Sequence, residues 1–176
     1  GVISKGGEEP IYIPDHCQAK FTIRSFSMKY KLELLERFKK ICEHVAAITN
    51  TRLEFSFDGL SYEDIRNNQS LENALEKNFT DLGEIVKPRE KALGIGCTDM
   101  GNVTHEIPGL QSYVLVVPET RGHTKEFEDA CYSEAGHKTI AVGSKAMAMT
   151  AVDVLTDPEL LEAIRRDFKE MKEKYE

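Results

Sequence analysis

The stretch GHTKEFEDACYSEAGHK, residues 122–138, contains two histidines and four carboxylates in seventeen positions. Histidine and carboxylate side chains bind zinc and also transfer protons in catalysis. His123 is the candidate metal ligand, yet zinc needs about three protein ligands and no others stand at a recognisable spacing. The alternative is an exposed loop histidine ahead of Thr124, a good N-cap for a helix with an acidic first turn. The residues by themselves leave both interpretations open.

A second polar segment, TDMGNVTH at 98–105, offers side chains that could contact a ligand: Asp99, Asn102, Thr104 and His105. The surrounding region, 93–109, is so rich in glycine and polar residues that we predict no regular structure there. Its glycines could let the backbone approach a ligand closely. The alternative is a hydrogen-bonded loop whose Asp and Asn side chains accept from nearby backbone amides.

Two further residues have a chemical and an ordinary interpretation. Arg24 ends a predicted strand, where its guanidinium could hold a substrate carboxylate or form a surface ion pair. His137 falls on a predicted buried helix, so we expect it to pack there and to bond a backbone carbonyl. The chain contains no GxSxG, phosphate-loop, HExxH or dinucleotide-binding motif. These residues alone therefore do not identify a function.

The elements before residue 58 predict a small α+β unit. CQAKFTIRS at 17–25 and RLEFSF at 52–57 alternate apolar and polar residues, which predicts half-buried strands. Between them, 28–48 has one apolar stripe at helical spacing. A helix on one face of a small antiparallel sheet follows from this order. Two or three strands make a thin sheet, so the unit looks incomplete.

The residues after 60 predict an α/β piece. A helix is expected over 61–83 with Gly83 as its C-cap, and a second one, rich in small residues, over 134–155. The segment LQSYVLVV at 110–117 predicts a short strand buried on both faces. Asp157 and Pro158 open a last helix. Its inward residues are expected to be Leu161, Ile164, Phe168 and Met171.

Composition excludes several classes of protein. Of the 176 residues 40% are apolar and 30% charged, which is typical of a globular protein. The net charge of −7 argues against a nucleic-acid-binding surface, which needs clustered Lys and Arg. No apolar run approaches the ~20 residues that span a bilayer. Four widely spaced cysteines fit reduced, mostly buried thiols and a cytoplasmic location.

Four stretches, taken in order, resemble the zinc-dependent aminoacylase/carboxypeptidase family. They are GGEEPIYIPDHCQAKFTIRS, GCTDMGNVTHEIPG, GHTKEFEDACYSEAGHK and AMAMTAVDVLTDPELLEAIRRDF. That family includes acetylornithine deacetylase, succinyl-diaminopimelate desuccinylase and aminobenzoyl-glutamate hydrolase, and the amidohydrolase branch with the last of these is the most similar. The resemblance covers nearly the whole chain.

The resemblance implies an α/β fold in two parts. Residues 1–58 would be a partial ferredoxin-like lid, or dimerisation, domain, which is α+β. Residues 59–176 would be the C-terminal part of a zinc-exopeptidase-like catalytic α/β domain. In the family the lid interrupts the catalytic domain, so this chain would begin partway through the lid and lack the N-terminal catalytic half.

The resemblance also implies roles for single residues. His123 matches the terminal ligand of a pair of zinc ions, a site that other divalent metals such as manganese or cobalt can also fill. Arg24 matches the lid arginine associated with the substrate carboxylate. Asp99 and Asn102 lie in the loop that lines the site, and His105 is a weaker candidate for substrate contact. The other metal ligands and the general base belong to the missing half, so we expect no catalytic residue in this chain.

We therefore expect the C-terminal part of a metal-dependent amidohydrolase or peptidase. It would cleave the amide bond of an N-acyl amino acid or dipeptide, would be inactive by itself, and would form a homodimer through the lid. The alternative is a non-enzymatic dimerisation or interaction module derived from that family, pairing through strand edges and the helix at 28–49. A small-molecule-binding protein that uses the 94–105 loop is a third hypothesis.

Overall fold

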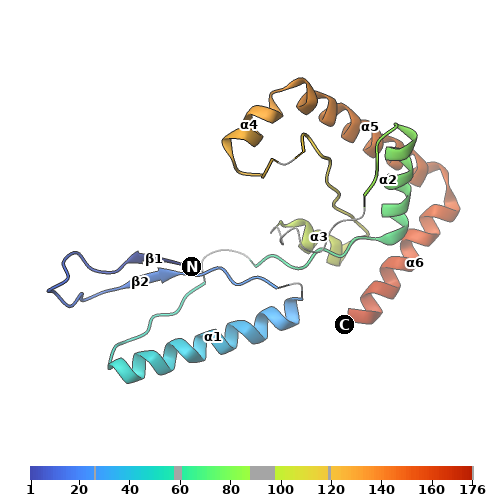
Figure 1. Cartoon of the computed structure of the whole chain (residues 1–176). Coiled ribbons are helices and arrows are strands. Elements are labelled where there is room, and N and C mark those ends of the chain that lie inside the picture. Colours follow the sequence, from blue (N-terminus) through green and yellow to red (C-terminus); the bar gives the residue numbers. More distant parts are fainter. Residues whose placement is uncertain (26, 58–60, 88–97, 119, 176) are drawn as a thin grey trace. The chain divides into compact units, whose positions relative to one another are not determined.

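The computed structural model describes residues 1–25, 27–57, 61–87, 98–118 and 120–175, and divides the chain into two compact units, Gly1–Asp64 and Ile65–Glu176. The elements are β1 (Val2–Lys5), β2 (Gln18–Lys20) and α1 (Met28–Thr49) in the first unit, and α2 (Gln69–Asp81), α3 (Met100–Glu106), α4 (Lys125–Cys131), α5 (Glu134–Thr156) and α6 (Pro158–Tyr175) in the second (Figure 1). The predicted mixture of helices and strands is confirmed in these coarse terms. The identities of the parts as lid and catalytic domain stay a prediction.

β1 and β2 form a short antiparallel pair in the first unit. Their register shifts between Ile3 and Lys5, and Ser4 at the shift donates its hydroxyl to Gln18 Oε1 at 2.9 Å. The predicted strand over 17–25 is thus confirmed only for its residues in β2. A ladder extends only as far as its partner strand, and β1 has four residues.

The predicted helix over 28–48 is confirmed as α1. Ser27 caps its start, where Oγ accepts a hydrogen bond from Tyr30 N at 3.4 Å. Asn50 ends it in the left-handed region at φ 53°, and its N–H donates to Ala47 O at 3.3 Å. Asparagine tolerates this conformation, so the sequence TN after the apolar stripe stops the helix there.

Aromatic rings join three segments of the first unit. Phe38 of α1 lies between Phe21 and Phe55, with ring centroids 4.9 Å and 6.2 Å away, and Phe57 lies 5.7 Å from Phe55. The alternation that predicted a strand over 52–57 thus reflects side chains that do meet. The predicted strand itself is wrong, because among the described residues this segment pairs with no other strand.

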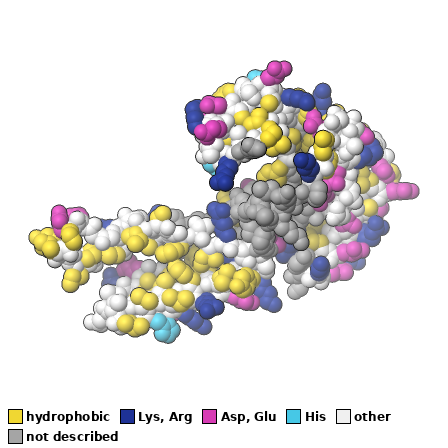
Figure 2. All heavy atoms as spheres, viewed as in Figure 1, with side chains coloured by type: hydrophobic (Ala, Val, Ile, Leu, Met, Phe, Trp, Pro, Cys, Tyr) yellow, Lys and Arg dark blue, Asp and Glu magenta, His cyan; other side chains and the backbone are white. Residues whose placement is uncertain are grey.

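The apolar stripe of α1 does not form a core. No described residue of the first unit is buried, and Ile41, Val45 and Ile48 are 54%, 53% and 84% exposed. Figure 2 shows hydrophobic side chains along the surface of β1, β2 and α1. A helix in a protein gains most of its stability from burying such a stripe. The C-terminal half of α1 therefore presents an apolar face that no described residue of this unit covers.

The second unit begins with a helix that is shorter than predicted. We expected helix over 61–83, whereas α2 starts after Asn68, whose Oδ1 accepts from Leu71 N at 3.1 Å. An asparagine that caps a helix holds an extended backbone, so the residues before it are not helical. Gly83 follows the helix at φ 82°, which confirms the predicted terminating glycine.

The last two helices agree with the sequence prediction. α5 covers the expected 134–155 and one residue more at its end. Asp157 Oδ1 accepts hydrogen bonds from Glu159 N at 2.9 Å and Leu160 N at 3.1 Å, so the predicted cap before Pro158 is confirmed. Ile164 is 4% exposed on the inward side of α6, as its spacing predicted.

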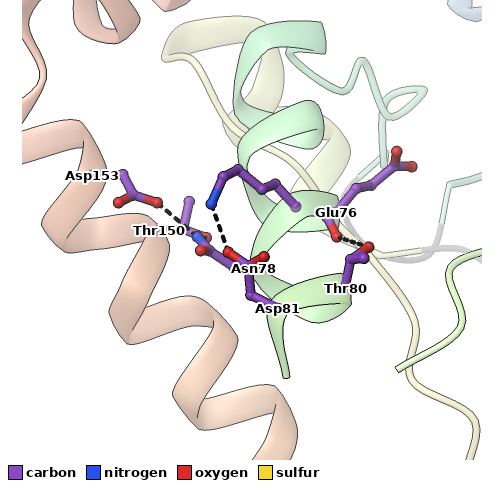
Figure 3. A network of polar contacts seen from close by, with 7 residues as sticks. Glu76, Asn78, Thr80, Asp81, Thr150 and Asp153 are labelled. Atoms are coloured by element: carbon purple, nitrogen blue, oxygen red, sulfur yellow. Dashed lines mark hydrogen bonds and ion pairs between the residues drawn. The ribbon is translucent and has the colours of Figure 1, made fainter. Parts of the chain in front are cut away.

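The core of this unit lies where α2 packs on α5 and α6. Ala146 of α5 is fully buried and Leu75 of α2 is 5% exposed. Beside them, Asn78 Nδ2 donates to Thr150 Oγ1 at 3.0 Å and to Asp153 Oδ2 at 2.8 Å (Figure 3). A buried amide that finds both partners fixes the alignment of the two helices.

α4 and α5 join at a position that only glycine fits. A Cβ added to Gly136 would lie 2.2 Å from Cys131 O, closer than any real contact. Ser133 caps α5 here, and its Oγ accepts from Gly136 N at 3.3 Å. The tight approach lets α5 start three residues after α4 ends.

Two predictions for the middle of the second unit are wrong. The region 93–109, expected to be irregular, contains the seven-residue helix α3, although its first part at 93–97 lies outside the described residues. The strand expected over 110–117 is absent as a strand, because among the described residues no other strand pairs with it. Strand formation depends on a distant partner, and a local pattern does not supply one.

The cysteines differ from the expectation of buried thiols. Cys17 and Cys131 are exposed and Cys42 is half-buried, whereas Cys97 lies outside the described residues. In the part of the chain that the structure describes, every helix is too short or too polar to cross a membrane.

Candidate functional site

Three of the predicted substrate-contact residues share one side of α3. Asp99, Asn102 and His105 follow each other at intervals of three, which places them on neighbouring positions of one helix face. Asp99 and Asn102 are exposed and His105 is half-buried. Asp99 stands at the N-cap position but caps no backbone N–H, and its Oδ1 accepts from Thr98 Oγ1 at 3.3 Å. The face therefore presents a carboxylate, an amide and an imidazole together.

Thr104 holds α3 from the opposite side. Its side chain is fully buried, and its hydroxyl accepts from Arg66 N at 3.1 Å and donates to Gly101 O at 3.0 Å. A Cβ added to Gly109 would lie 3.3 Å from Thr104 Cγ2, so the chain beyond the helix packs closely on this threonine. The sequence grouped Thr104 with the ligand-contacting side chains, and the structure shows it as a support for them.

The asparagine pair before α2 was missed by the sequence analysis. Asn67 Oδ1 accepts from Gln111 N at 3.0 Å, and Asn67 Nδ2 donates to Gln111 O at 3.3 Å and Glu72 Oε1 at 3.1 Å. Asn68 Nδ2 donates to Ile164 O at 2.8 Å. Asn67 thus joins the start of α2 to the segment after α3, and Asn68 joins the start of α2 to α6. The available signal was an asparagine pair directly before an amphipathic pattern, which is typical of an N-cap.

His123 lies in the loop before α4 and is exposed. Its φ is 67°, in the left-handed region that costs a non-glycine residue about 1–2 kcal/mol. Thr124 caps α4 as predicted, with Oγ1 accepting from Phe127 N at 3.2 Å and donating to Arg121 O at 2.9 Å. The capped turn thus holds the imidazole in a strained backbone position, and such positions cluster at functional sites.

An open surface hollow of about 520 Å³ surrounds this histidine. Its lining residues are Gly122, His123, Thr124, Lys125, Phe127 and Glu128. The acids nearby are partly neutralised, because Lys125 Nζ lies 3.3 Å from Glu128 Oε1 and 2.9 Å from Asp129 Oδ1. The predicted role of these acids as first-turn residues of a helix fits α4, which starts at Lys125.

The described residues do not complete a metal site around His123. Among them, no group of three or more His, Cys, Asp and Glu side chains is placed to hold a metal ion. Catalytic zinc takes about three protein ligands, and one imidazole with two lysine-paired carboxylates nearby does not match that set. The hollow therefore offers one donor to a metal rather than a binding site for it.

The remaining candidates belong to other elements than α3. Arg24 is exposed and belongs to the first unit, in the segment that follows β2. His137 is exposed near the start of α5, so the prediction that it packs in a core is wrong. Three of the candidates thus share the single helix α3, whereas His123 belongs to another segment, the loop before α4 (Figure 1).

Comparison with known proteins gives relatives along almost the whole chain. The chain is 34% identical over 172 residues to a Homo sapiens protein named Xaa-Arg dipeptidase, and 31% identical over 172 residues to the Mus musculus protein of the same name. Each match covers 96% of this chain but only 39% and 40% of the respective relative. The chain thus spans about two fifths of their length. No family model matches it.

Proposed function

We propose that this chain is part of a metal-dependent amide-bond hydrolase, and that it is inactive by itself. The observation that carries the proposal is the similarity to two dipeptidases over 96% of the chain. Their name specifies a dipeptide that ends in arginine, so a dipeptide of this class is the first substrate to test, with N-acyl amino acids next. The inactivity is proposed because the chain matches only 39% and 40% of the relatives' length, and because no three His, Cys, Asp or Glu side chains among the described residues are placed to hold a metal ion.

Within this proposal each candidate residue has one role. His123 is one ligand of a zinc pair, and the other ligands come from polypeptide outside this chain. The exposed side of α3, with Asp99 and Asn102 and more weakly His105, contacts the substrate. Arg24 holds the substrate carboxylate through its planar, two-pronged guanidinium.

The two parts of the chain would then have different tasks. Residues 1–58 act as part of a lid that pairs two copies of the protein, and residues 59–176 belong to the catalytic domain. The open apolar face of α1 supports the pairing, since Val45 and Ile48 are 53% and 84% exposed. Large exposed apolar faces on a helix are typical of an interface.

Calorimetry with zinc and an assay for arginine release test the proposal. The chain alone is expected to bind no stoichiometric zinc and to release no arginine from an Xaa-Arg dipeptide. Mixed with the part of the Homo sapiens relative that lies outside the match, it is expected to do both. His123→Ala in the mixture should abolish release, whereas His137→Ala, an exposed histidine on α5, should not. A mixture with neither zinc binding nor release contradicts the proposal.

A non-enzymatic dimerisation module is the second candidate. The observation in its favour is the first unit, where no described residue is buried and α1 keeps its apolar face open. Light scattering separates the two candidates in combination with the assay: a dimer without any arginine release in the mixture favours the module. A strict monomer at high concentration argues against it.

A further inference from the structure

In the segment 114–117 the backbone N–H groups have no hydrogen-bond acceptor among the described residues. The backbone N–H groups of Val114, Leu115, Val116 and Val117 donate to no atom of the described protein. Two of the carbonyls accept only side-chain hydroxyls, Leu115 O from Thr139 Oγ1 at 3.5 Å and Val117 O from Thr120 Oγ1 at 3.1 Å. Backbone N–H groups that become buried are nearly always paired. These four consecutive apolar residues therefore present an edge at which another strand can form backbone hydrogen bonds.

The two sides of this segment differ as they do in a strand. Val114 and Val116 are half-buried, and a Cβ added to Gly143 of α5 would lie 3.8 Å from Val114 Cγ2. Tyr113 and Leu115 point away and are 61% and 71% exposed. From Tyr113 to Val116 exposed and half-buried residues thus alternate with the period of two of a β-strand, whereas Val117 is half-buried like Val116. α5 lies against one face, and no described residue covers the edge or the other face.

The surface of α5 continues this open area. Ile140 and Met147 stand next to Thr139 and Gly143 on the helix, and they are 65% and 63% exposed. A second strand laid beside 114–117 would cover such apolar neighbours. Because sheets in α/β proteins have helices packed on their faces, this part of α5 has the character of a helix that lacks most of its sheet.

The relatives have the length to supply a second strand, because this chain matches only about two fifths of each.

We propose that residues 114–117 form an edge strand that pairs with a β-strand of another polypeptide segment, the counterpart of the part of the relatives that this chain does not match. The new strand covers Ile140 and Met147, and α5 becomes the helical layer beneath the joined sheet. Backbone pairing supplies the affinity, and the exposed side chains of Tyr113 and Leu115 meet a second layer on the other face. The proposal rests on the proposed function only through the partial match to the relatives, since association does not require hydrolysis.

Amide hydrogen exchange tests this pairing. The probe is the part of the Homo sapiens relative outside the match, produced separately and mixed with the full 176-residue chain. In the chain alone, the N–H groups of 114–117 should exchange nearly as fast as in an unfolded peptide. In the mixture they should slow by at least about 100-fold, because the pairing protects them from water. An inactive mixture that shows this protection supports the pairing while contradicting the proposed function.

A charge-matched pair of variants sharpens the result. Leu115→Lys places a charge on the exposed apolar face and should abolish the protection, whereas Gln69→Lys on the exposed side of α2 should leave it intact. Helical circular dichroism should be unchanged in both, since Leu115 is 71% exposed. Three results overturn the proposal: N–H groups of 114–117 that are already protected in the chain alone, no complex with the probe, or protection that depends on the concentration of this chain alone and so reports a second copy.

Discussion

Asn78 of α2 and Asp153 of α5 are joined by a 2.8 Å hydrogen bond at the centre of the second unit. Asn78 is 2% exposed and also donates to Thr150, which is 7% exposed (Figure 3). The amide therefore has polar partners on the facing helix instead of apolar packing. This bond aligns α2 with α5, and α5 in turn carries the surface on which 114–117 rests.

Removing the Asn78 amide should destabilise the second unit. Asn78→Ala leaves a cavity and removes the donor from the buried Thr150 hydroxyl and the half-buried Asp153 carboxylate, so the free energy of unfolding should fall by about 2–3 kcal/mol. Urea denaturation followed by circular dichroism measures the change. The matched control is Asn73→Ala on the exposed side of α2, which should cost under about 0.5 kcal/mol. Equal effects of the two substitutions would mean that the α2–α5 alignment does not depend on this amide.

The ion pair of Lys77 with Asp81 predicts how stability and the pKa of Lys77 behave at high pH. The pKa of Lys77 is raised above its ordinary value of 10.5, first by the hydrogen bond to Asp81 and second by the charge of that carboxylate. Because the folded pKa exceeds the unfolded one, the stabilising contribution is complete below pH 10.5 and is lost as the pH rises through the folded pKa. In an NMR titration of the Lys77 side chain, Asp81→Asn should lower the pKa toward 10.5. Glu162→Gln on α6 should leave it unchanged, and a shift from both substitutions would contradict the stated cause.

Two substitutions at His123 separate the effect of its strained backbone from the effect of its imidazole. His123→Gly and His123→Ala both remove the imidazole, but only glycine adopts φ 67° at no steric cost. The glycine variant should therefore be more stable than the alanine variant by about 1 kcal/mol in chemical denaturation. Metal binding in the mixture with the relative's remainder should be lost equally in both. A glycine variant no more stable than the alanine variant would show that this loop is not held in the left-handed conformation.

The Thr104 hydroxyl should matter more than its methyl group. Thr104→Val keeps the shape but leaves Arg66 N without its acceptor, which should cost about 1–2 kcal/mol and speed the exchange of that N–H. Thr104→Ser keeps the hydroxyl and should preserve the slow exchange. If valine and serine variants exchange alike, the hydroxyl does not hold α3 in place.

Much of the helical part of this fold could be predicted from local signals. The caps Thr124 and Asp157 and the terminating Gly83 act within one turn of the chain, so their neighbours in sequence determine their role. α3 was missed because its glycine and polar residues are typical of loops. Its support comes from Arg66, which is 38 positions away from Thr104.

For the strands predicted over 52–57 and 110–117, the pattern of side chains was informative, but the backbone pairing it implied was wrong. Phe55 and Phe57 do meet other rings, and Val114 does face α5, yet neither segment forms a ladder among the described residues. Backbone pairing depends on a second strand that no local pattern specifies. A similar limit applies to the candidate site, where the sequence singled out Asp99, Asn102 and His105 but not the helix α3 that carries them.

Pairing of two copies through α1 has its own test. Val45→Lys puts a charge on the exposed apolar face and should shift the molecule to a monomer in light scattering. His44→Lys, at the neighbouring exposed position, adds the same charge beside that face and should leave the dimer intact. A wild-type chain that is monomeric at high concentration contradicts the pairing outright.

Arginine release from an Xaa-Arg dipeptide, measured for the chain alone and for its mixture with the unmatched part of the Homo sapiens relative, tests the central claim most directly. We expect no release by the chain alone, release by the mixture, and loss of release when the mixture contains the His123→Ala chain. Release by the chain alone, or a mixture as inactive as its components, would contradict the proposal that this chain supplies part of a hydrolase active site.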